Sequence, residues 1–227
     1  MIIEHIPIDI ESFTSDVIAS LQRESELKSL RSLMEVSDLS ELKSAIVFVT
    51  VVSVFFDGIN KDTPEDHSIL HNSVVRIFAE NPKCRDIVSQ GHYITAVFDT
   101  PFKSDIDNVL DSVGKINAIF NIVYNIRKSN RISGIRKGIG MAYGNVLLTT
   151  IGAGEQAVCN WSGSTYETAT GYAKDAAENA NSKVLATYTI YNNLKEDYQK
   201  LFKEADKDKY EAYPVNIAME KWSKSNV

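Results

Sequence analysis

The pattern of hydrophobic and polar positions changes period several times along the chain, and each change marks an expected element. Residues 45–52, AIVFVTVV, form a continuous apolar and β-branched run, which is typical of a strand buried on both faces of a sheet. Residues 1–43 instead place leucine and isoleucine at roughly helical spacing among charged side chains. The two patterns predict an N-terminal helical segment over 1–43 and one larger domain over 44–227.

Within the larger domain, helical and strand patterns alternate. Pro64 followed by two acids is a typical helix entry, and Asn81-Pro82 ends the predicted helix. The remaining expected elements are strands at 86–89 and 93–98 around the turn 90–92, a helix over about 103–127, two strands joined near Ala142–Asn145, a helix over 169–180, a strand over 183–186, a helix over 187–204 and a last strand over 212–218. This order predicts an α+β domain in which a mixed or antiparallel sheet carries helices on its faces.

Composition narrows the setting of this domain. A chain of 227 residues can bury a full core without a disulfide or metal staple, and its two cysteines, Cys84 and Cys159, suit a reducing cytoplasm. The net charge of −6 argues against nucleic-acid binding, which needs a basic surface. No signal peptide is visible, and no apolar run reaches the ~18 residues of a membrane helix. We expect a cytoplasmic protein that binds neither nucleic acid nor membranes.

Several strings in the sequence resemble the catalytic domain of class III nucleotidyl cyclases. AIVFVTVV is similar to that family's first strand, and QGHYITAVFDTP to a hairpin in which Gly-Asp precedes an apolar strand. RKGIGMAYGNVLLTTIGAG resembles its glycine-rich hairpin and is the most specific part, through Gly138, Gly140 and Gly144. The resemblance covers about residues 44–218 and implies a class III cyclase-like fold with a ferredoxin-like core. Within the family, the chain looks most like the bacterial pyrimidine cyclases of antiphage defence.

The resemblance implies a metal site whose ligands are altered. Such cyclases use two divalent ions held by two aspartates on neighbouring strands, because Mg²⁺ and Mn²⁺ prefer carboxylate oxygens. The matching positions here hold Thr50 and His92, so both carboxylates are expected to be missing. Asp57 lies seven residues beyond Thr50, about 23 Å along an extended chain, and we interpret it as too distant. Asp86, before the hairpin turn, is the one candidate substitute ligand.

The second half of the family's site is altered too. There, a helix of the partner subunit brings Asn to the ribose and Arg to the phosphates, where it stabilises developing charge. Counted from Gly163, these two positions hold Glu167 and Gly171, which offer a repelling charge and no side chain. No arginine follows Arg136 anywhere in the chain. Because both halves of the site are altered, we expect this chain to complete neither half of a cyclase by the usual chemistry.

A few residues remain as candidates for contact with a nucleotide. The positions that the resemblance leaves for this role are Ser53, Gly91, Trp161 and Ser164. A basic cluster also precedes the glycine-rich string, and we interpret it as a solvated linker, with contact to a triphosphate as the alternative; it comprises Lys128, Arg131, Arg136 and Lys137.

The sequence therefore predicts a catalytically degenerate cyclase-like domain, a pseudo-cyclase that acts as a binding or regulatory module. We expect a homodimer, because the family's site lies between two subunits, and binding of a nucleoside triphosphate or a cyclic nucleotide, with no metal cofactor. One alternative is a divergent active pyrimidine cyclase that makes cyclic UMP or cyclic CMP with Mn²⁺ or Mg²⁺. The other is a regulatory partner of an active cyclase.

Overall fold

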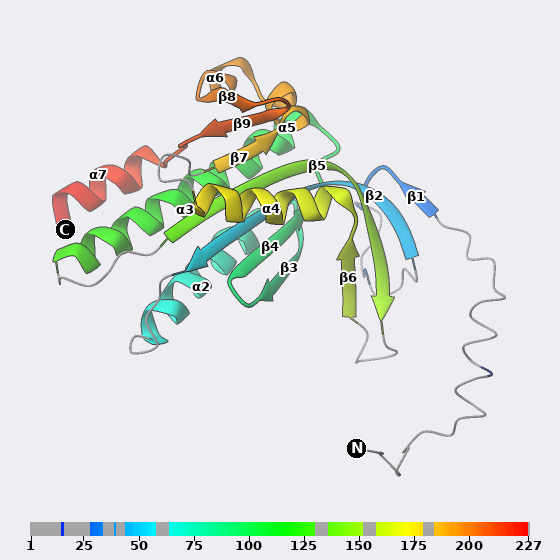
Figure 1. The fold of residues 1–227 in the computed structure, drawn as a ribbon, viewed down its shortest axis with the longest axis horizontal. Helices are drawn as coiled ribbons and strands as arrows, with labels where there is room; N and C mark the ends of the chain where they lie inside the picture. The colour runs from blue at the N-terminus through cyan, green and yellow to red at the C-terminus, as the bar shows by residue number, and fades with distance from the viewer. Residues whose placement is uncertain are drawn as a thin grey trace, which may run out of the picture.

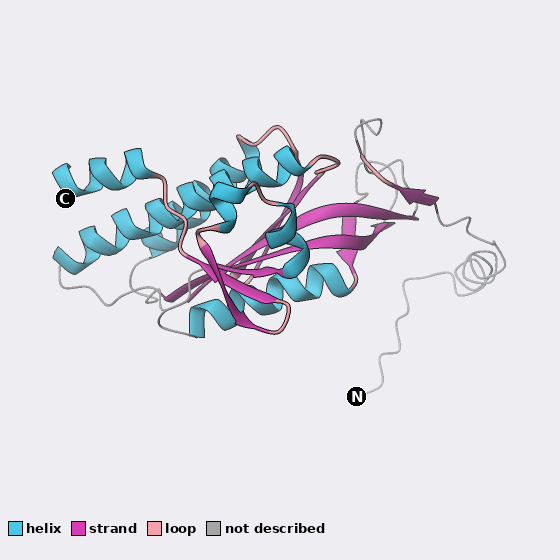
Figure 2. Cartoon of the chain, turned by 90° about the horizontal axis from the view of Figure 1, so that it is seen from above, coloured by secondary structure: helices cyan, strands magenta, loops and turns pink. Residues whose placement is uncertain are grey.

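A mixed β-sheet organises the chain. The computed structural model describes Ser15 and residues 28–33, 39, 44–57, 64–129, 136–151, 158–178 and 184–226. Within these ranges nine strands form one sheet in the order β3-β4-β2-β5-β7-β9-β8, with β1 added to β2 and β6 added to β5. Helices lie on both faces of this sheet (Figures 1 and 2). The predicted α+β class, a mixed sheet with helices on its faces, is confirmed.

Two long antiparallel strands form the centre of the sheet. β2 (Ser44–Asp57) pairs with β5 (Arg136–Ile151) along its whole length, from Ser44 opposite Thr149 to Asp57 opposite Arg136. On its other side β2 pairs with β4 (Tyr93–Phe98), which forms a hairpin with β3 (Cys84–Gln90). The remaining strands are β1 (Lys28–Leu30), β6 (Val158–Ser162), β7 (Val184–Thr187), β8 (Phe202–Asp206) and β9 (Lys209–Ala212).

The predicted pair of strands around Ala142–Asn145 is wrong, because one continuous strand, β5, runs through this segment. Gly144 stands opposite Val49 in the ladder, so no turn occurs there. Gly144 instead faces Thr165, and the Thr165 Oγ1 would lie only 2.7 Å from a Cβ atom added at this glycine. The glycines of this string therefore mark close packing of a helix on the sheet, not a chain reversal.

Side chains of β2 alternate between two cores, one on each face of the sheet. Val52, Val54 and Phe56 point into the larger core, which α2 (Pro64–Ala79) and α3 (Lys103–Ser129) cover. Val49 and Val51 point to the other face, where α4 (Ser164–Glu178), Leu33 and Trp161 of β6 close a smaller core. The sheet is thus covered by helices on both faces, but unequally.

The end of the chain differs most from the predicted elements. The predicted helix over 187–204 and strand over 212–218 are wrong: this region forms α5 (Tyr188–Asn193), α6 (Glu196–Gln199), the β8–β9 hairpin and α7 (Ile217–Asn226). The hairpin was hidden because its strands are highly charged, as suits a sheet edge, and only Phe202 and Ala212 are buried. α7 begins where the Asn216 side chain accepts a hydrogen bond from the Met219 backbone N–H at 3.0 Å.

Most of the segment over 1–43 lies outside the described residues. Within it, Lys28–Leu30 form the short strand β1, parallel to β2, where a helix was predicted. The Ser32 hydroxyl donates a hydrogen bond to the Asp99 carboxylate at 2.8 Å, and Leu33 is fully buried, so this part of the chain completes the smaller core. The division between 1–43 and 44–227 stays a prediction. Among the described helices, none is long and apolar enough to cross a membrane.

Candidate functional site

One face of the sheet is only partly covered by a helix. Among the described helices, α4 lies along β5 and reaches β4 through Tyr166, which hydrogen-bonds to Thr95, and it covers less of β3 and the rest of β4 (Figure 1). Strand alternation places Phe55, Tyr93 and Val88 on this face, and all three side chains are half-buried. We call this area of β2, β4 and β3 the open strip. Partly exposed apolar side chains on a sheet face are typical of a surface that binds a ligand or another chain.

At one end of the open strip lies a charged pair. Asp57 is the last residue of β2 and stands opposite Arg136, the first residue of β5, and its carboxylate pairs with the Arg136 guanidinium. The turn of the β3–β4 hairpin lies next to this pair, because the backbone N–H of Phe56 donates a hydrogen bond to the His92 carbonyl at 3.1 Å. We call Asp57, Arg136 and His92 the strand-end site. Asp57 and Thr50 lie seven residues apart on β2, so their predicted separation holds, but Asp57 lies beside the hairpin that carries His92.

Aromatic rings flank the strand-end site. The Phe55 ring lies 5.8 Å from the His92 ring and 5.0 Å from the Tyr93 ring, both in tilted arrangements. Both His92 and the Arg136 guanidinium are exposed, the latter at 63% of its side chain. The corner of the sheet therefore combines one carboxylate, one guanidinium and several aromatic rings. A guanidinium can bind a phosphate group, and aromatic rings can stack on a flat ring of the same ligand.

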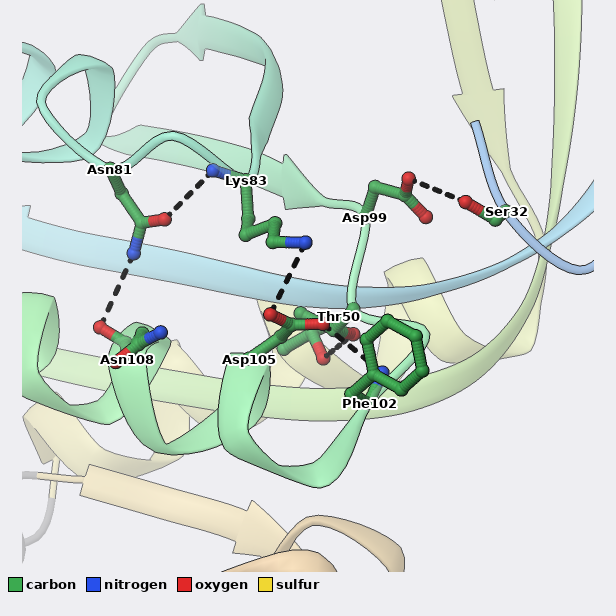
Figure 3. Close-up of polar contacts among 9 residues, drawn as sticks. Ser32, Thr50, Asn81, Lys83, Asp99, Phe102, Asp105 and Asn108 are labelled. Atoms are coloured by element: carbon green, nitrogen blue, oxygen red, sulfur yellow. Dashed lines mark hydrogen bonds and ion pairs between the residues drawn. The ribbon is translucent and has the colours of Figure 1, made fainter. Parts of the chain in front are cut away.

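Thr50 is far from this corner, so its assignment as a partner of His92 is wrong. In the β2–β4 ladder Thr50 stands opposite Phe98, whereas Phe55 stands opposite Tyr93, so Thr50 and the hairpin are about 17 Å apart along the strand. The buried Thr50 hydroxyl hydrogen-bonds to that of Thr100 at 2.7 Å. Figure 3 shows it beside a polar cluster at the start of α3, where Lys83 pairs with Asp105 at 3.2 Å. Its role is structural.

Asp86 does not approach His92 either. It stands opposite Val97, four ladder positions from Tyr93, and its carboxylate accepts the Trp161 indole N–H at 2.6 Å. Trp161 is 5% exposed and packs in the smaller core, so both residues hold β6 against β3. The expected substitution of Asp86 for a metal ligand beside His92 is therefore wrong.

The other residues singled out from the sequence are scattered over the same face. Ser53 is fully buried and hydrogen-bonds to Thr95 at 2.9 Å, which leaves it no surface for a ligand. Gly91, with a φ of 59°, forms the hairpin turn next to His92, so it lies at the strand-end site. Ser164, Glu167 and Gly171 lie exposed on α4. The structure thus brings Gly91 and His92 to Asp57, and leaves their contact with the α4 residues a prediction.

The strand-end site does not offer the ligands of a two-ion centre. Mg²⁺ and Mn²⁺ require several oxygen ligands, and carboxylates are preferred. Asp57 supplies one carboxylate, which Arg136 already neutralises, and the hairpin contributes an imidazole. Over the described ranges, no three His, Cys, Asp or Glu side chains gather closely enough to hold a metal ion. These residues therefore do not fit the divalent ions that the family resemblance implies.

Comparisons with known proteins bear on the fold. No protein family model matches the sequence. A uridylate cyclase from Treponema porcinum is 26% identical over 188 residues, which cover 74% of this chain and 65% of that protein. A bacterial light-regulated adenylyl cyclase has a TM-score of 0.64 at 12% identity, covering 98% of this chain and 69% of that chain. A class III adenylyl cyclase-like ATP-binding protein from Pseudomonas aeruginosa has a TM-score of 0.61 at 12% identity, and the match covers 95% of this chain and 48% of that chain.

The chain has the class III nucleotidyl cyclase fold. The resemblance inferred from its sequence strings is confirmed at this level. The chain spans about two thirds of the length of the uridylate cyclase that it matches, and about half of the ATP-binding protein.

Electrostatics vary along the open strip of this cyclase fold. Burial raises the pKa of the Tyr166 phenol, although its hydrogen bond to Thr95 acts in the opposite direction, and the Asp86 carboxylate raises it further. Tyr166 therefore stays a neutral donor in the middle of the strip. Charged side chains lie instead at the strand-end site, where the Arg136 guanidinium pairs with Asp57.

Proposed function

We propose that this chain is a homodimeric nucleotide-binding module built on the class III cyclase fold, with little or no cyclase turnover. The pairing of Asp57 with Arg136 beside His92 carries the proposal. In it, the guanidinium neutralises the carboxylate and presents its remaining N–H groups to the phosphates of a nucleoside triphosphate. A guanidinium suits this role because its donors match phosphate oxygens in bidentate geometry.

Uridine triphosphate is the first ligand to test. The support is the 26% identity to a uridylate cyclase, whose name indicates a uridine nucleotide as its substrate. Phe55, Tyr93 and His92 offer ring faces next to Arg136 on which a base can stack. Glu167 and Gly171 on α4 add no positive charge, which favours binding over stabilisation of a transition state.

Calorimetric titration of UTP into the full chain in EDTA tests the role of Arg136. Loss of a charge-assisted hydrogen bond costs about 1.5–3 kcal/mol, so Arg136→Gln is expected to weaken binding about 10- to 150-fold. Arg76→Gln is the matched control, because Arg76 is 82% exposed on α2, on the opposite face of the sheet. Equal affinities for the two variants would contradict the proposal. A parallel incubation with UTP, CTP, ATP or GTP and Mn²⁺ is expected to yield no cyclic product.

The homodimer is proposed through the open strip. Isologous dimers are the commonest assemblies, and the strip leaves Phe55, Tyr93 and Val88 half-exposed for a second copy to cover. Sedimentation analysis is expected to give a dimer for the parent chain and a monomer for Phe55→Glu. Ile69→Glu, at a side chain 54% exposed on α2, is the control and should stay dimeric. A dimer that survives Phe55→Glu would place the interface elsewhere.

An active pyrimidine cyclase is the second candidate. It is favoured by the uridylate cyclase relative and by the carboxylate that Asp57 retains at the strand end. This candidate predicts cyclic UMP formation with Mn²⁺ that Asp57→Asn abolishes, whereas the binding module predicts none. The expected cytoplasmic location and role in antiphage defence stay predictions.

A further inference from the structure

A cavity of about 530 Å³ opens on the face of the molecule that α3 and α7 cover, away from the open strip. Three segments line it: one turn of α3 around Gly114, Tyr198 of α6 with Leu201 just beyond that helix, and the segment from Tyr213 into the first turn of α7. Figure 1 shows α7 beside α3, below the β8–β9 hairpin. The volume lies within the range of small-molecule sites, about 300–1,000 Å³.

The walls of this cavity are mainly apolar, and its rim is unusually exposed for such side chains. Leu110 forms a buried floor at 2% exposure. Leu201, Tyr213 and Ile217 stand at the rim with 51%, 43% and 68% of their surface exposed. Single exposed apolar side chains are common on protein surfaces, but three around one cavity are typical of a site where a ligand covers them.

Polar contacts between α3 and the segment before α7 fix the shape of the cavity, and one of them is the hydrogen bond that the Asn117 amide donates to the Pro214 carbonyl at 2.8 Å. The Tyr213 hydroxyl donates a hydrogen bond to the Asn121 side-chain oxygen at 2.5 Å, and the Lys137 ammonium lies 5.5 Å from the Tyr213 ring. The Gly114 carbonyl accepts a hydrogen bond from the Asn216 backbone N–H at 3.0 Å. These hydrogen bonds hold the wall formed by the segment before α7 to α3, as expected for a preformed site.

Asp111 sets the chemistry that the cavity accepts. It lies exposed on α3 at the rim, and one of its carboxylate oxygens accepts the Tyr198 hydroxyl at 2.5 Å. No cation is among the lining residues, all of which lie in the described part of the chain. The Lys195 ammonium lies 3.8 Å from the Tyr198 ring centre and is attracted by the Asp111 carboxylate, but it does not line the cavity. A carboxylate at an apolar rim attracts a cationic or hydrogen-bond-donating group.

We infer that this cavity is a binding site for a small, mostly apolar amine, whose ring or chain fills the apolar walls and whose ammonium group meets Asp111. The site is independent of the strand-end site and of the proposed nucleotide. Its concave form and volume favour a small molecule over a protein partner, because a protein surface would need a wider and flatter contact.

Titration of the ¹⁵N-labelled full chain with 2-phenylethylamine, followed by amide NMR, tests the inference without any nucleotide. Saturable shifts are expected at Gly114 and between Tyr213 and Ala218. The carboxylate analogue 3-phenylpropionate is expected to bind about 2- to 5-fold more weakly, the effect of one exposed charge. Asp111→Asn is expected to remove that preference and to keep the apolar contribution.

Variants that fill the cavity separate it from unspecific binding. Ala218→Trp places an indole at an exposed lining position and is expected to abolish the shifts. Ser225→Trp, exposed on the same helix outside the lining, is the matched control and should bind as the parent chain does. The NMR spectrum also reports whether each variant is folded. Shifts that are absent, spread over the surface, or equal for amine and carboxylate would overturn the inference.

Discussion

Replacing Gly140 by alanine is expected to displace α4 from the sheet. An added Cβ at this position would lie 2.0 Å from the Ala169 carbonyl oxygen and 2.6 Å from the Ala173 backbone nitrogen. Ordinary contact begins at 3.4 Å, so the helix backbone would have to retreat by about 1.4 Å. Ala169 and Ala173 are fully buried against the sheet, so the retreat opens a gap along the smaller core.

The cost follows from overpacking against backbone atoms, which cannot rotate away. Extra groups in a packed core cost about 1–3 kcal/mol, and we expect about 3 kcal/mol for Gly140→Ala, or a melting temperature lowered by about 6–12 °C. Gly171→Ala is the matched control, since its Cβ would meet nothing within 4 Å and alanine favours a helix by about 1 kcal/mol. Urea unfolding of both variants measures the difference. A Gly140→Ala variant within about 0.5 kcal/mol of the parent would refute the close packing.

Two further predictions concern single side chains elsewhere in the fold. Burial raises the pKa of the Cys84 thiol from 9.0 to about 12, so iodoacetamide should alkylate a Cys159→Ser chain about 1,000-fold more slowly when folded than in urea; comparable rates at pH 8 would contradict this. Because the folded pKa exceeds the unfolded one, Cys84 stabilises the fold below pH 9 and loses that effect as the pH rises toward 12. Lys83→Met should cost about 1–3 kcal/mol in urea unfolding, since it leaves the Asp105 carboxylate, 8% exposed, without its cation. Arg76→Met removes one partner of an exposed ion pair and should cost less than about 0.5 kcal/mol. Equal losses of stability in the two variants would contradict the claim that burial makes the Lys83–Asp105 pair the stronger one.

Much of the fold could be predicted because its central elements have strong hydrophobic patterns. The apolar run at 45–52 is the core of β2, and the broad apolar face over 103–127 is α3. The β8–β9 hairpin could not be predicted, because an edge strand needs few buried residues and its charged sequence has no clear period. Gly144 was interpreted as a turn because glycine marks turns and close helix approaches alike, and only the ladder separates these two uses.

The candidate site shows a different limit of sequence reasoning. Family resemblance identified the hairpin with Gly91 and His92, but the residue of β2 that meets this hairpin depends on antiparallel register, which spacing along one strand cannot give. Asp57 ends the apolar run directly after two phenylalanines, and this sudden change from apolar to acidic was the available signal. Its pairing with Arg136 joins residues 79 positions apart and follows only from the long β2–β5 ladder.

Titration of UTP into the Asp57→Asn variant, in EDTA and again with Mn²⁺, tests the central claim most directly. If Arg136 holds the phosphates, removal of the competing carboxylate frees the guanidinium, and UTP should bind the variant at least as tightly as the parent chain in EDTA. Mn²⁺ should then add little to the affinity of either protein. Binding that requires Mn²⁺ in the parent chain and disappears in Asp57→Asn would contradict the account, because it would make Asp57 a metal ligand.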